Sequence, residues 1–399
     1  MQEMRRKELC EEKMKVYLDN AATTSVDKRV LDAMMPYFSD KYGNPSSIYS
    51  FSNEARTAVG EAREKIAKLI GADASEIIFT SGGTEADNLA IKGIAGKRGH
   101  IVTSTIEHPA VLNVCKALEK QGFEVTYVPV DKDGIISAED VRNAIRGDTV
   151  LIIVMHANNE IGTIQPVEAI GKIAREKGIV FHTDAVQSVG KIPVDVKKMN
   201  VDLLTISSHK IYGPKGVGAL FVRNGTKLDA LTHGGGHENN MRSGTENVAG
   251  IVGFGKAAEI ALNEMDSDAE KLKRLRDKLI DNALKMDNSW LNGSRENRLP
   301  GNVNLGFKFI EGEALVLELD FNGIYASTGS ACSSKSLEPS HVLRALGLPA
   351  EYCHGSLRMT LGKYTTDKEI DYVLEVLPKV VGKLREISPF KKEFDVNVQ

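Results

Sequence analysis

Apolar residues fall into two kinds of segment along the first half of the chain. Short runs rich in β-branched residues, such as LIIVM at 151–155, are typical of strands covered on both faces by helices. The pattern predicts strands at 76–80, 100–104, 124–128, 149–155, 179–183, 203–207 and 218–222. Between them, apolar residues at helical spacing predict helices at 85–95, 110–121, 138–145 and 167–176. This alternation predicts an α/β fold with a mostly parallel sheet.

The pattern changes after about residue 245. A long charge-rich helix is predicted as far as about 286, followed by a smaller set of α+β elements. These are a strand near 302–307, a helix at 311–319, a strand near 357–361 and a closing helix at 366–384. A chain of 399 residues is long for one core. We therefore expect a large α/β domain at 15–265 and a small α+β domain at 266–399, with the N-terminal segment packing on the small domain.

Composition narrows the classes of partner. The net charge of −3 gives no reason to expect nucleic acid or an anionic membrane as a partner. No apolar run approaches the ~20 residues that a membrane span needs. Residues 1–13 are charged and lack the apolar centre of a secretory signal, which predicts a cytoplasmic protein. The four cysteines form no close pair, so neither a disulfide framework nor a zinc motif is expected.

Two polar signals each follow a predicted strand. Gly82 and Gly83 open a helix directly after the strand EIIFT, and such a helix N-terminus suits a phosphate group. The alternative is a simple turn. Asp184 ends another apolar strand, where a carboxylate can pair with a protonated heterocyclic nitrogen. The alternative is a helix N-cap.

A lysine forms the third signal of this kind. Lys210 lies in SSHKIYGP, at the end of the strand 203–207, where a lysine among polar groups can form a Schiff base. A surface charge is the alternative for an isolated lysine. The order of phosphate loop, acid and lysine, each at a strand end, favours the functional interpretation of all three.

Two further residues stand out in the second half of the chain. Cys332 lies in a stretch of small residues, 327–336, whose composition is typical of a mobile loop. Arg358 lies within the apolar strand 357–361, where an arginine is costly without a partner. A substrate carboxylate would satisfy it in bidentate fashion, and a structural ion pair is the alternative.

Motifs along nearly the whole chain, from 15 to about 384, carry a specific resemblance. They include YLDNAATT (17–24), FTSGGTEADNLAI (79–91), EHPAV (107–111), NNEIG (158–162), HTDAVQSVG (182–190), SSHKIYGPKGVGAL (207–220), MRSGTENV (241–248) and STGSACSS (327–334). With these motifs in this order, the chain resembles the fold-type I pyridoxal-phosphate (PLP) enzymes, and specifically the IscS/NifS-type cysteine desulfurases of the class V aminotransferase family.

The resemblance implies a role for each matching residue. Lys210 would hold PLP covalently, Asp184 would pair with its ring nitrogen, Gln187 would bond its ring hydroxyl and His108 would stack on the ring and act in catalysis. Asn159 would contact the cofactor or the substrate, and Arg358 would bind the substrate carboxylate. The phosphate would be held by Gly83, Thr84, Ser207 and His209, and by Thr245 from the other subunit of a homodimer. Cys332 would be the nucleophile that accepts sulfur from L-cysteine as a persulfide.

The resemblance also implies partners. The sulfur would supply iron–sulfur cluster assembly through an IscU-like scaffold protein, and tRNA thiolation is a second possible use; Cys332 would be a shared iron–sulfur ligand with that scaffold. Two other classes compete with this hypothesis. A related PLP lyase or aminotransferase would not need Cys332. A non-catalytic assembly protein would be expected to have lost Lys210, Asp184 or Cys332, and all three are present.

Overall fold

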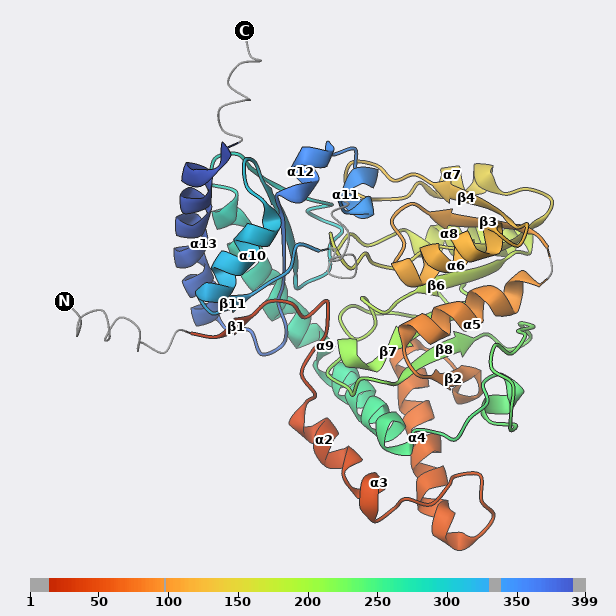
Figure 1. Cartoon of the computed structure of the whole chain (residues 1–399). Helices are drawn as coiled ribbons and strands as arrows, with labels where there is room; N and C mark the ends of the chain where they lie inside the picture. The colour runs from red at the N-terminus through yellow and green to blue at the C-terminus, as the bar shows by residue number, and fades with distance from the viewer. Residues whose placement is uncertain (1–13, 97, 330–338, 390–399) are drawn as a thin grey trace.

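The computed structural model describes residues 14–96, 98–329 and 339–389 (Figure 1). A seven-stranded sheet has the strand order β2-β8-β7-β6-β5-β3-β4. Its strands are β2 (Ile77–Thr80), β3 (His100–Ser104), β4 (Glu124–Val128), β5 (Thr149–Ile153), β6 (Val180–Asp184), β7 (Leu203–Ser207) and β8 (Gly218–Val222). Only β8 runs antiparallel to its neighbours in this sheet. The prediction of a mostly parallel sheet is therefore confirmed.

Helices cover both faces of this sheet (Figure 1). They are α4 (Asn53–Ile70), α5 (Gly83–Ala95), α6 (Pro109–Glu119), α7 (Ala138–Ala144) and α8 (Val167–Lys177). Successive strand residues point to opposite faces. Leu151 and Ile153 accordingly pack in one apolar cluster with Ile91 of α5 and Val111 of α6. Ile152 belongs to the cluster on the other face. Burial on both sides explains why these strands consist of uninterrupted apolar residues.

The small domain is built on a three-stranded antiparallel sheet. β10 (Asn302–Phe307) lies between β9 (Ser289–Leu291) and β12 (Ser356–Thr360). The helices of this part are α10 (Gly312–Phe321), α11 (His341–Ala345), α12 (Ala350–His354) and α13 (Asp367–Ile387). The N-terminal strand β1 (Val16–Tyr17) pairs with β11 (Ile324–Tyr325), and Val16 lies in this second core. The N-terminal strand thus packs against the elements of this second core.

One helix joins the two cores. α9 (Val248–Ala283) contributes Ile251 and Phe254 to the core behind the large sheet, and Leu275 and Leu279 to the core of the small domain. The proposed division between residues 265 and 266 falls within this helix and stays a prediction.

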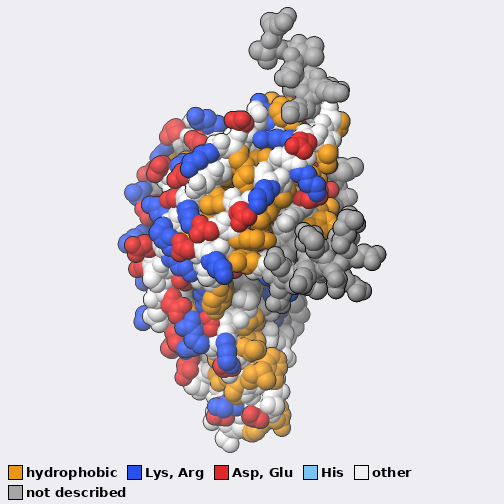
Figure 2. Space-filling view, turned by 90° about the vertical axis from the view of Figure 1, so that its left-hand side faces the viewer, with side chains coloured by type: hydrophobic (Ala, Val, Ile, Leu, Met, Phe, Trp, Pro, Cys, Tyr) orange, Lys and Arg blue, Asp and Glu red, His pale blue; other side chains and the backbone are white. Residues whose placement is uncertain are grey.

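Three N-terminal helices were not anticipated from the sequence: α2 (Lys28–Met34), α3 (Pro36–Ser39) and α4. Charged residues fill much of their length, and α2 and α4 pack against α9. The buried residues of α4, among them Ala55, Val59, Ala62 and Ile66, nevertheless recur at helical spacing, so its own pattern also indicates a helix. Near their ends, several large apolar side chains are exposed: Met35, Phe38, Tyr42, Ile48 and Phe51. Figure 2 shows apolar side chains gathered at the lower end of the face it displays.

Four predicted strands differ at their ends from those observed. β2 begins one residue after the start of the strand predicted at 76–80, and β12 begins and ends one residue before the strand predicted near 357–361. The strand predicted at 149–155 stops at Ile153. Val154 still donates to His182 of β6, but Met155 donates to the carboxylate of Glu107 instead of to a neighbouring strand. The strand predicted at 179–183 begins and ends one residue later, which makes Asp184 its last residue. In the described part of the chain, no helix has the length and apolarity to cross a membrane.

Candidate active site

Several of the predicted site residues lie at the carboxyl edge of the large sheet. β2 and β7 flank β8, and Thr80 and Ser207 both pair with Gly218, so the two strands end at the same level. A Cβ on Gly218 would lie 2.8 Å from Gly82, so only glycine allows the turn after β2 to approach this closely. The edge where parallel strands end is where α/β proteins bind ligands.

A polar cavity lies at the N-terminus of α5. Its lining includes the four residues predicted to hold a phosphate within one chain: Gly83, Thr84, Ser207 and His209. The N-cap of α5 is Gly82, which has no side chain to bond the first N–H groups of the helix. These groups and the positive end of the helix dipole make the cavity suitable for an anion. Burial lowers the pKa of His209 to about 4, so its imidazole is neutral here.

Thr245 does not line this cavity. Its side chain is exposed, between Ser243 and the start of α9. Its predicted contact with the phosphate requires a second copy of the chain and stays a prediction.

Lys210 ends a short 3-10 helix, η3 (Ser208–Lys210), directly after β7. Its ammonium donates to the carbonyl oxygens of Ala21 and Ala22 at 2.5 and 2.6 Å. The neighbouring His209 Nδ1 lies 3.0 Å from Thr23 Oγ1. The N-terminal segment thus forms one wall of the site and holds the lysine at the strand end.

Asp184 is almost fully buried at the end of β6. Its Oδ1 accepts the N–H of Val186 at 2.9 Å, a local turn rather than a helix cap, since no helix begins there. Burial raises the pKa of this carboxyl, and the imidazole of His108 partly offsets the effect. A carboxylate kept this dry is poised to share a proton with a buried partner.

His108 is the N-cap of α6. Its Nδ1 accepts the N–H of Ala110 at 3.1 Å, so the neutral ring carries its proton on Nε2. Burial lowers the pKa of this imidazole, while Asp184 acts in the opposite direction. The structure therefore brings His108 near Asp184, as a group able to face a bound ring.

Gln187 has both ends of its amide engaged. Its Nε2 donates to Ala21 O at 3.0 Å, and its Oε1 accepts from Lys191 Nζ at 3.1 Å. The carbonyl of Ala21 thus receives hydrogen bonds from both Gln187 and Lys210. The predicted bond from Gln187 to a ring hydroxyl stays a prediction.

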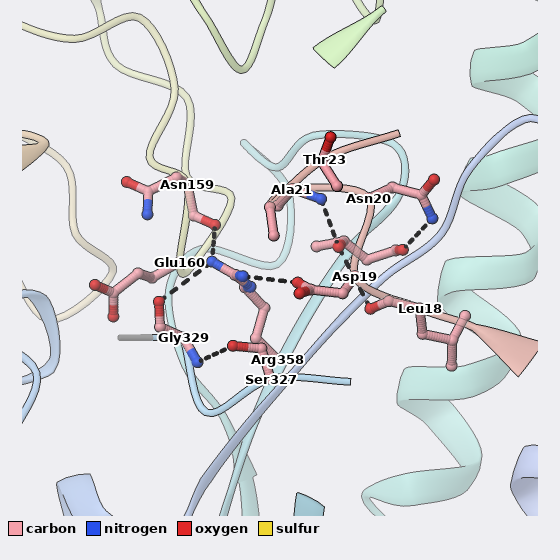
Figure 3. Close-up of polar contacts among 12 residues, drawn as sticks. Leu18, Asp19, Asn20, Ala21, Thr23, Asn159, Glu160, Ser327, Gly329 and Arg358 are labelled. Carbon is pink, nitrogen blue, oxygen red and sulfur yellow. Dashed lines mark hydrogen bonds and ion pairs between the residues drawn. The ribbon is translucent and has the colours of Figure 1, made fainter. Parts of the chain in front are cut away.

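Arg358 is 3% exposed and lies at the middle of β12, an edge strand of the three-stranded sheet. Figure 3 shows its guanidinium between Asp19, Asn159 and Gly329. Nη2 lies 2.8 Å from Asp19 Oδ1, and Nη1 donates to the carbonyls of Asn159 and Gly329. Nε is buried without a hydrogen-bond partner among the described residues. The ion pair considered for Arg358 is thus present, and part of the guanidinium remains for a ligand.

Cys332 lies outside the described residues, as does Cys10. The two described cysteines, Cys115 and Cys353, are buried. Burial raises the pKa of their thiols to about 12 and about 11, so neither is a reactive thiolate near neutral pH.

Several acidic groups beside the site were not predicted from the sequence. Asp19 lies within the motif YLDNAATT, but the motif does not predict its contact with Arg358. Glu107 and Asp87 are buried carboxyls that interact with Asp184. One signal was available: an acid directly after an apolar strand, as in YLD at 17–19, is a reason to look for a cationic partner.

Comparison with known proteins places the chain in a family. A profile of the aminotransferase class-V family matches residues 16–373. The chain therefore belongs to this family, and the predicted fold class is confirmed. It is similar to "Cysteine desulfurase IscS" of Dictyoglomus turgidum, with 58% identity over 96% of this chain and 99% of the relative.

Two solved structures are also similar to the chain over most of its length. One titled "NIFS-LIKE PROTEIN" is 41% identical, covers 93% of this chain and 100% of its own, and superposes with a TM-score of 0.88. Another, titled "SspA in complex with cysteine", is also 41% identical, with a TM-score of 0.79 over 88% of this chain and 100% of its own.

Proposed function

We propose that the protein is a PLP-dependent cysteine desulfurase that converts L-cysteine to L-alanine and passes the sulfur on as an enzyme persulfide. The observation that carries the proposal is the meeting of three groups at one sheet edge: the amine of Lys210, the buried Asp184 and the cavity at the N-terminus of α5. The relatives named above, and a solved relative whose title includes bound cysteine, support this choice of substrate.

The residues present fit PLP. The cavity supplies helix N–H groups and the hydroxyls of Thr84 and Ser207 for a phosphate. Asp184 is an acid whose pKa is raised by burial, which suits a hydrogen bond to a ring nitrogen. Lys210 is the amine that would hold the cofactor covalently. When bound, PLP withdraws electrons from the substrate's α-carbon.

The protein's own groups then divide the work. Asp184 would hold a proton at the ring nitrogen, and the Lys210 amine would be the base that takes the proton from the substrate Cα. Arg358 would bind the substrate carboxylate and so orient Cα. His108 would offer its Nε2–H towards the bound cofactor and substrate. Asn159 contributes its carbonyl to holding Arg358.

Sulfur transfer is the task of Cys332. Its thiolate attacks the sulfur of the substrate, a new S–S bond forms, and the C–S bond breaks. The electron pair of that bond stays with the organic fragment, which takes up one proton at Cβ, regains at Cα the proton that Lys210 removed, and leaves as alanine. Cys115 and Cys353 are excluded from this step by burial.

Two assemblies belong to the same proposal. A homodimer is supported by the exposed Met35, Phe38 and Ile48, since a second copy would cover such an apolar surface. The exposed position of Thr245 also supports a homodimer, since this residue is expected to reach the phosphate bound by the other subunit. An iron–sulfur scaffold protein in the cytoplasm is the proposed acceptor of the sulfur, with Cys332 as the group that both proteins approach.

The experiment is a product assay on purified, PLP-loaded protein. Incubation with L-cysteine should give alanine and protein-bound sulfur in equal amounts in a single turnover. Lys210→Ala should lose the visible absorbance of the bound cofactor together with both products. Cys332→Ser should keep that absorbance but form no persulfide, whereas the matched control Cys115→Ser should behave as the wild type. Full alanine production by Cys332→Ser would contradict the proposal and favour a direct lyase.

A further inference from the structure

One short segment touches both ends of the candidate site. Residues 18–24 pass from the small domain to the large one, next to β12. The carbonyls of Ala21 and Ala22 hold the Lys210 ammonium. The Asp19 carboxylate holds the Arg358 guanidinium (Figure 3). The segment thus contacts the cofactor-binding amine and the substrate-binding arginine within four residues.

The backbone around Asp19 is fixed, while its side chain is held at one point. Asp19 forms a parallel bridge to Thr360, whose hydroxyl also accepts the N–H of Ala21 at 2.8 Å. The carbonyl of Asp19 accepts from the Tyr17 hydroxyl at 3.0 Å. Among the described residues, Arg358 is the hydrogen-bond partner of the Asp19 carboxylate. That side chain is 20% exposed, whereas Arg358 is 3% exposed.

The guanidinium is only partly satisfied. Nη1 is used by two carbonyls, Nη2 by Asp19, and Nε by no described residue. Nε and Nη2 form one edge of the guanidinium, the edge that binds a carboxylate with both oxygens. Asp19 therefore occupies half of that edge, and the other half, a buried donor, has no acceptor within residues 14–96, 98–329 and 339–389.

We propose that Asp19 is the resident counter-ion of Arg358, and that the α-carboxylate of the incoming amino acid takes its place at Nη2 while also accepting from Nε. This inference rests on the proposed function only in taking an amino acid as the ligand. The exchange keeps one negative charge on a buried cation at all times. A bare buried guanidinium would be strongly unfavourable. Rotation of the partly exposed Asp19 side chain into water is sufficient, because its backbone stays bonded to β12.

The exchange makes Asp19 a specificity device. A ligand with a carboxylate displaces Asp19 and gains the second hydrogen bond at Nε. An amine without a carboxylate cannot displace it, so Arg358 stays paired with Asp19. Asp19 thus lowers the affinity for every ligand a little and rejects ligands that lack the carboxylate.

The test uses full-length apo-protein in a low-chloride buffer, so that no other anion takes the edge. Thermal unfolding is followed in Asp19→Asn, in wild type and in the matched control Asp32→Asn, which removes an exposed acid on α2. L-alanine and ethylamine, which is alanine without the carboxylate, are titrated into each. Asp19→Asn should unfold at a lower temperature without ligand. Its half-stabilising L-alanine concentration should be about 10-fold lower than that of wild type, since one charge-assisted bond no longer competes.

Ethylamine should stabilise none of the three proteins, and Asp32→Asn should match wild type. In the loaded enzyme, the KM for L-cysteine should fall in Asp19→Asn with kcat little changed, and the KM for cysteamine should not move. If Asp19→Asn does not fold, Asp19→Ser removes the same charge and should show the same shift. Equal or weaker L-alanine binding in the neutral variants overturns the exchange. A wild type that binds L-alanine as described but releases no sulfur from cysteine overturns the proposed function and leaves the exchange standing.

Discussion

Two buried acids on opposite sides of the candidate site respond differently to burial. Asp27 and Glu107 are 3% and 0% exposed. Hydrogen bonds from Arg29, followed by Lys363, hold the pKa of Asp27 far below its usual range. Glu107 accepts from Ser104 Oγ at 2.6 Å and from the N–H of Met155 at 2.9 Å, and burial raises its pKa to about 8.

The difference lies in the partners. Asp27 has two cations, and the Lys363 ammonium lies 4.5 Å from the ring centre of Tyr212 and 5.0 Å from that of Tyr364. In the described part of the chain, the Glu107 carboxylate accepts only from neutral donors, and it lies near the carboxyl of Asp184. The first group of charges holds the small domain to the loop of Lys210. The second group consists of Glu107 and Asp184. Burial raises the pKa of both carboxyls, so each favours its protonated form beside the place where a cofactor would need a proton.

The largest effect is expected from Asp184, the buried acid that would contact the ring of the cofactor. Asp184→Asn should retain bound PLP, because the other contacts of the cavity are unchanged. Its turnover should fall by about 100- to 1,000-fold, since a neutral amide cannot keep the ring nitrogen protonated. Cofactor content by absorbance, followed by alanine release, measures both. Normal turnover at full cofactor occupancy would show that Asp184 is structural.

The second-largest effect is expected from the ion pair between Asp27 and Lys363. Lys363→Met removes one of the cations that neutralise Asp27 and should lower the unfolding free energy by about 3 kcal/mol, measured with urea. Lys363→Arg, which keeps the charge, should lose much less. A loss in the arginine variant equal to that in the methionine variant would mean that shape, not charge, holds the domains together.

The pH dependence of the same cluster has a definite sign. Because the folded pKa of Asp27 is depressed, its stabilising effect is present above the unfolded pKa of about 4 and is lost as the pH falls below it. Asp27→Asn should therefore remove part of the acid sensitivity of the wild type. Equal slopes of stability against pH below about 4 in the two proteins would contradict this.

Glu107 should give a smaller effect of the opposite sign. Its folded pKa of about 8 is raised, so the folded state binds a proton that the unfolded state has released. Wild-type stability should fall as the pH rises from about 4.3 towards that value. Glu107→Gln keeps an acceptor for Ser104 and removes the titration, so it should be more stable than wild type by about 1 kcal/mol at pH 8 and equal or less stable at pH 5. Melting temperatures at the two pH values decide the matter.

The smallest effect belongs to an exposed pair. Lys379 and Glu375 lie one turn apart on α13 at 2.8 Å, with both side chains more than 60% exposed. Lys379→Ala should change stability by less than about 0.5 kcal/mol. Lys379→Ala is therefore the baseline with which the variants of Lys363 and Glu107 are compared. If it lost as much unfolding free energy as Lys363→Met, burial would not be what distinguishes the two ion pairs.

The sequence predicted the parts of the fold that local pattern determines. The strands β3, β4, β7, β8 and β10 have the predicted bounds, and all except the edge strand β4 are buried along their whole length. The helices α2 and α3 are short and depend on packing against α9, whereas α4 carries an amphipathic pattern from which it could have been predicted.

The site divides in the same way. Lys210 and Asp184 could be predicted because a strand end in a parallel sheet is visible in the sequence. The pairing of Asp19 with Arg358 joins residues 339 positions apart, and no local pattern contains it. The same holds for Glu107 and Asp184, whose interaction depends on how β3 and β6 are brought together around β5.

The 36-residue helix α9 has a consequence for how the chain can change in evolution. Because one uninterrupted helix enters both cores, its phase sets the rotation of the small domain about the helix axis. Adding or removing one residue between Ile260 and Leu275 would turn Arg358 by about 100° around that axis relative to Lys210. Insertions of seven residues, close to two full turns, would restore the angle but displace the arginine by about 10 Å along the axis. This stretch should therefore tolerate substitution far better than any change in length.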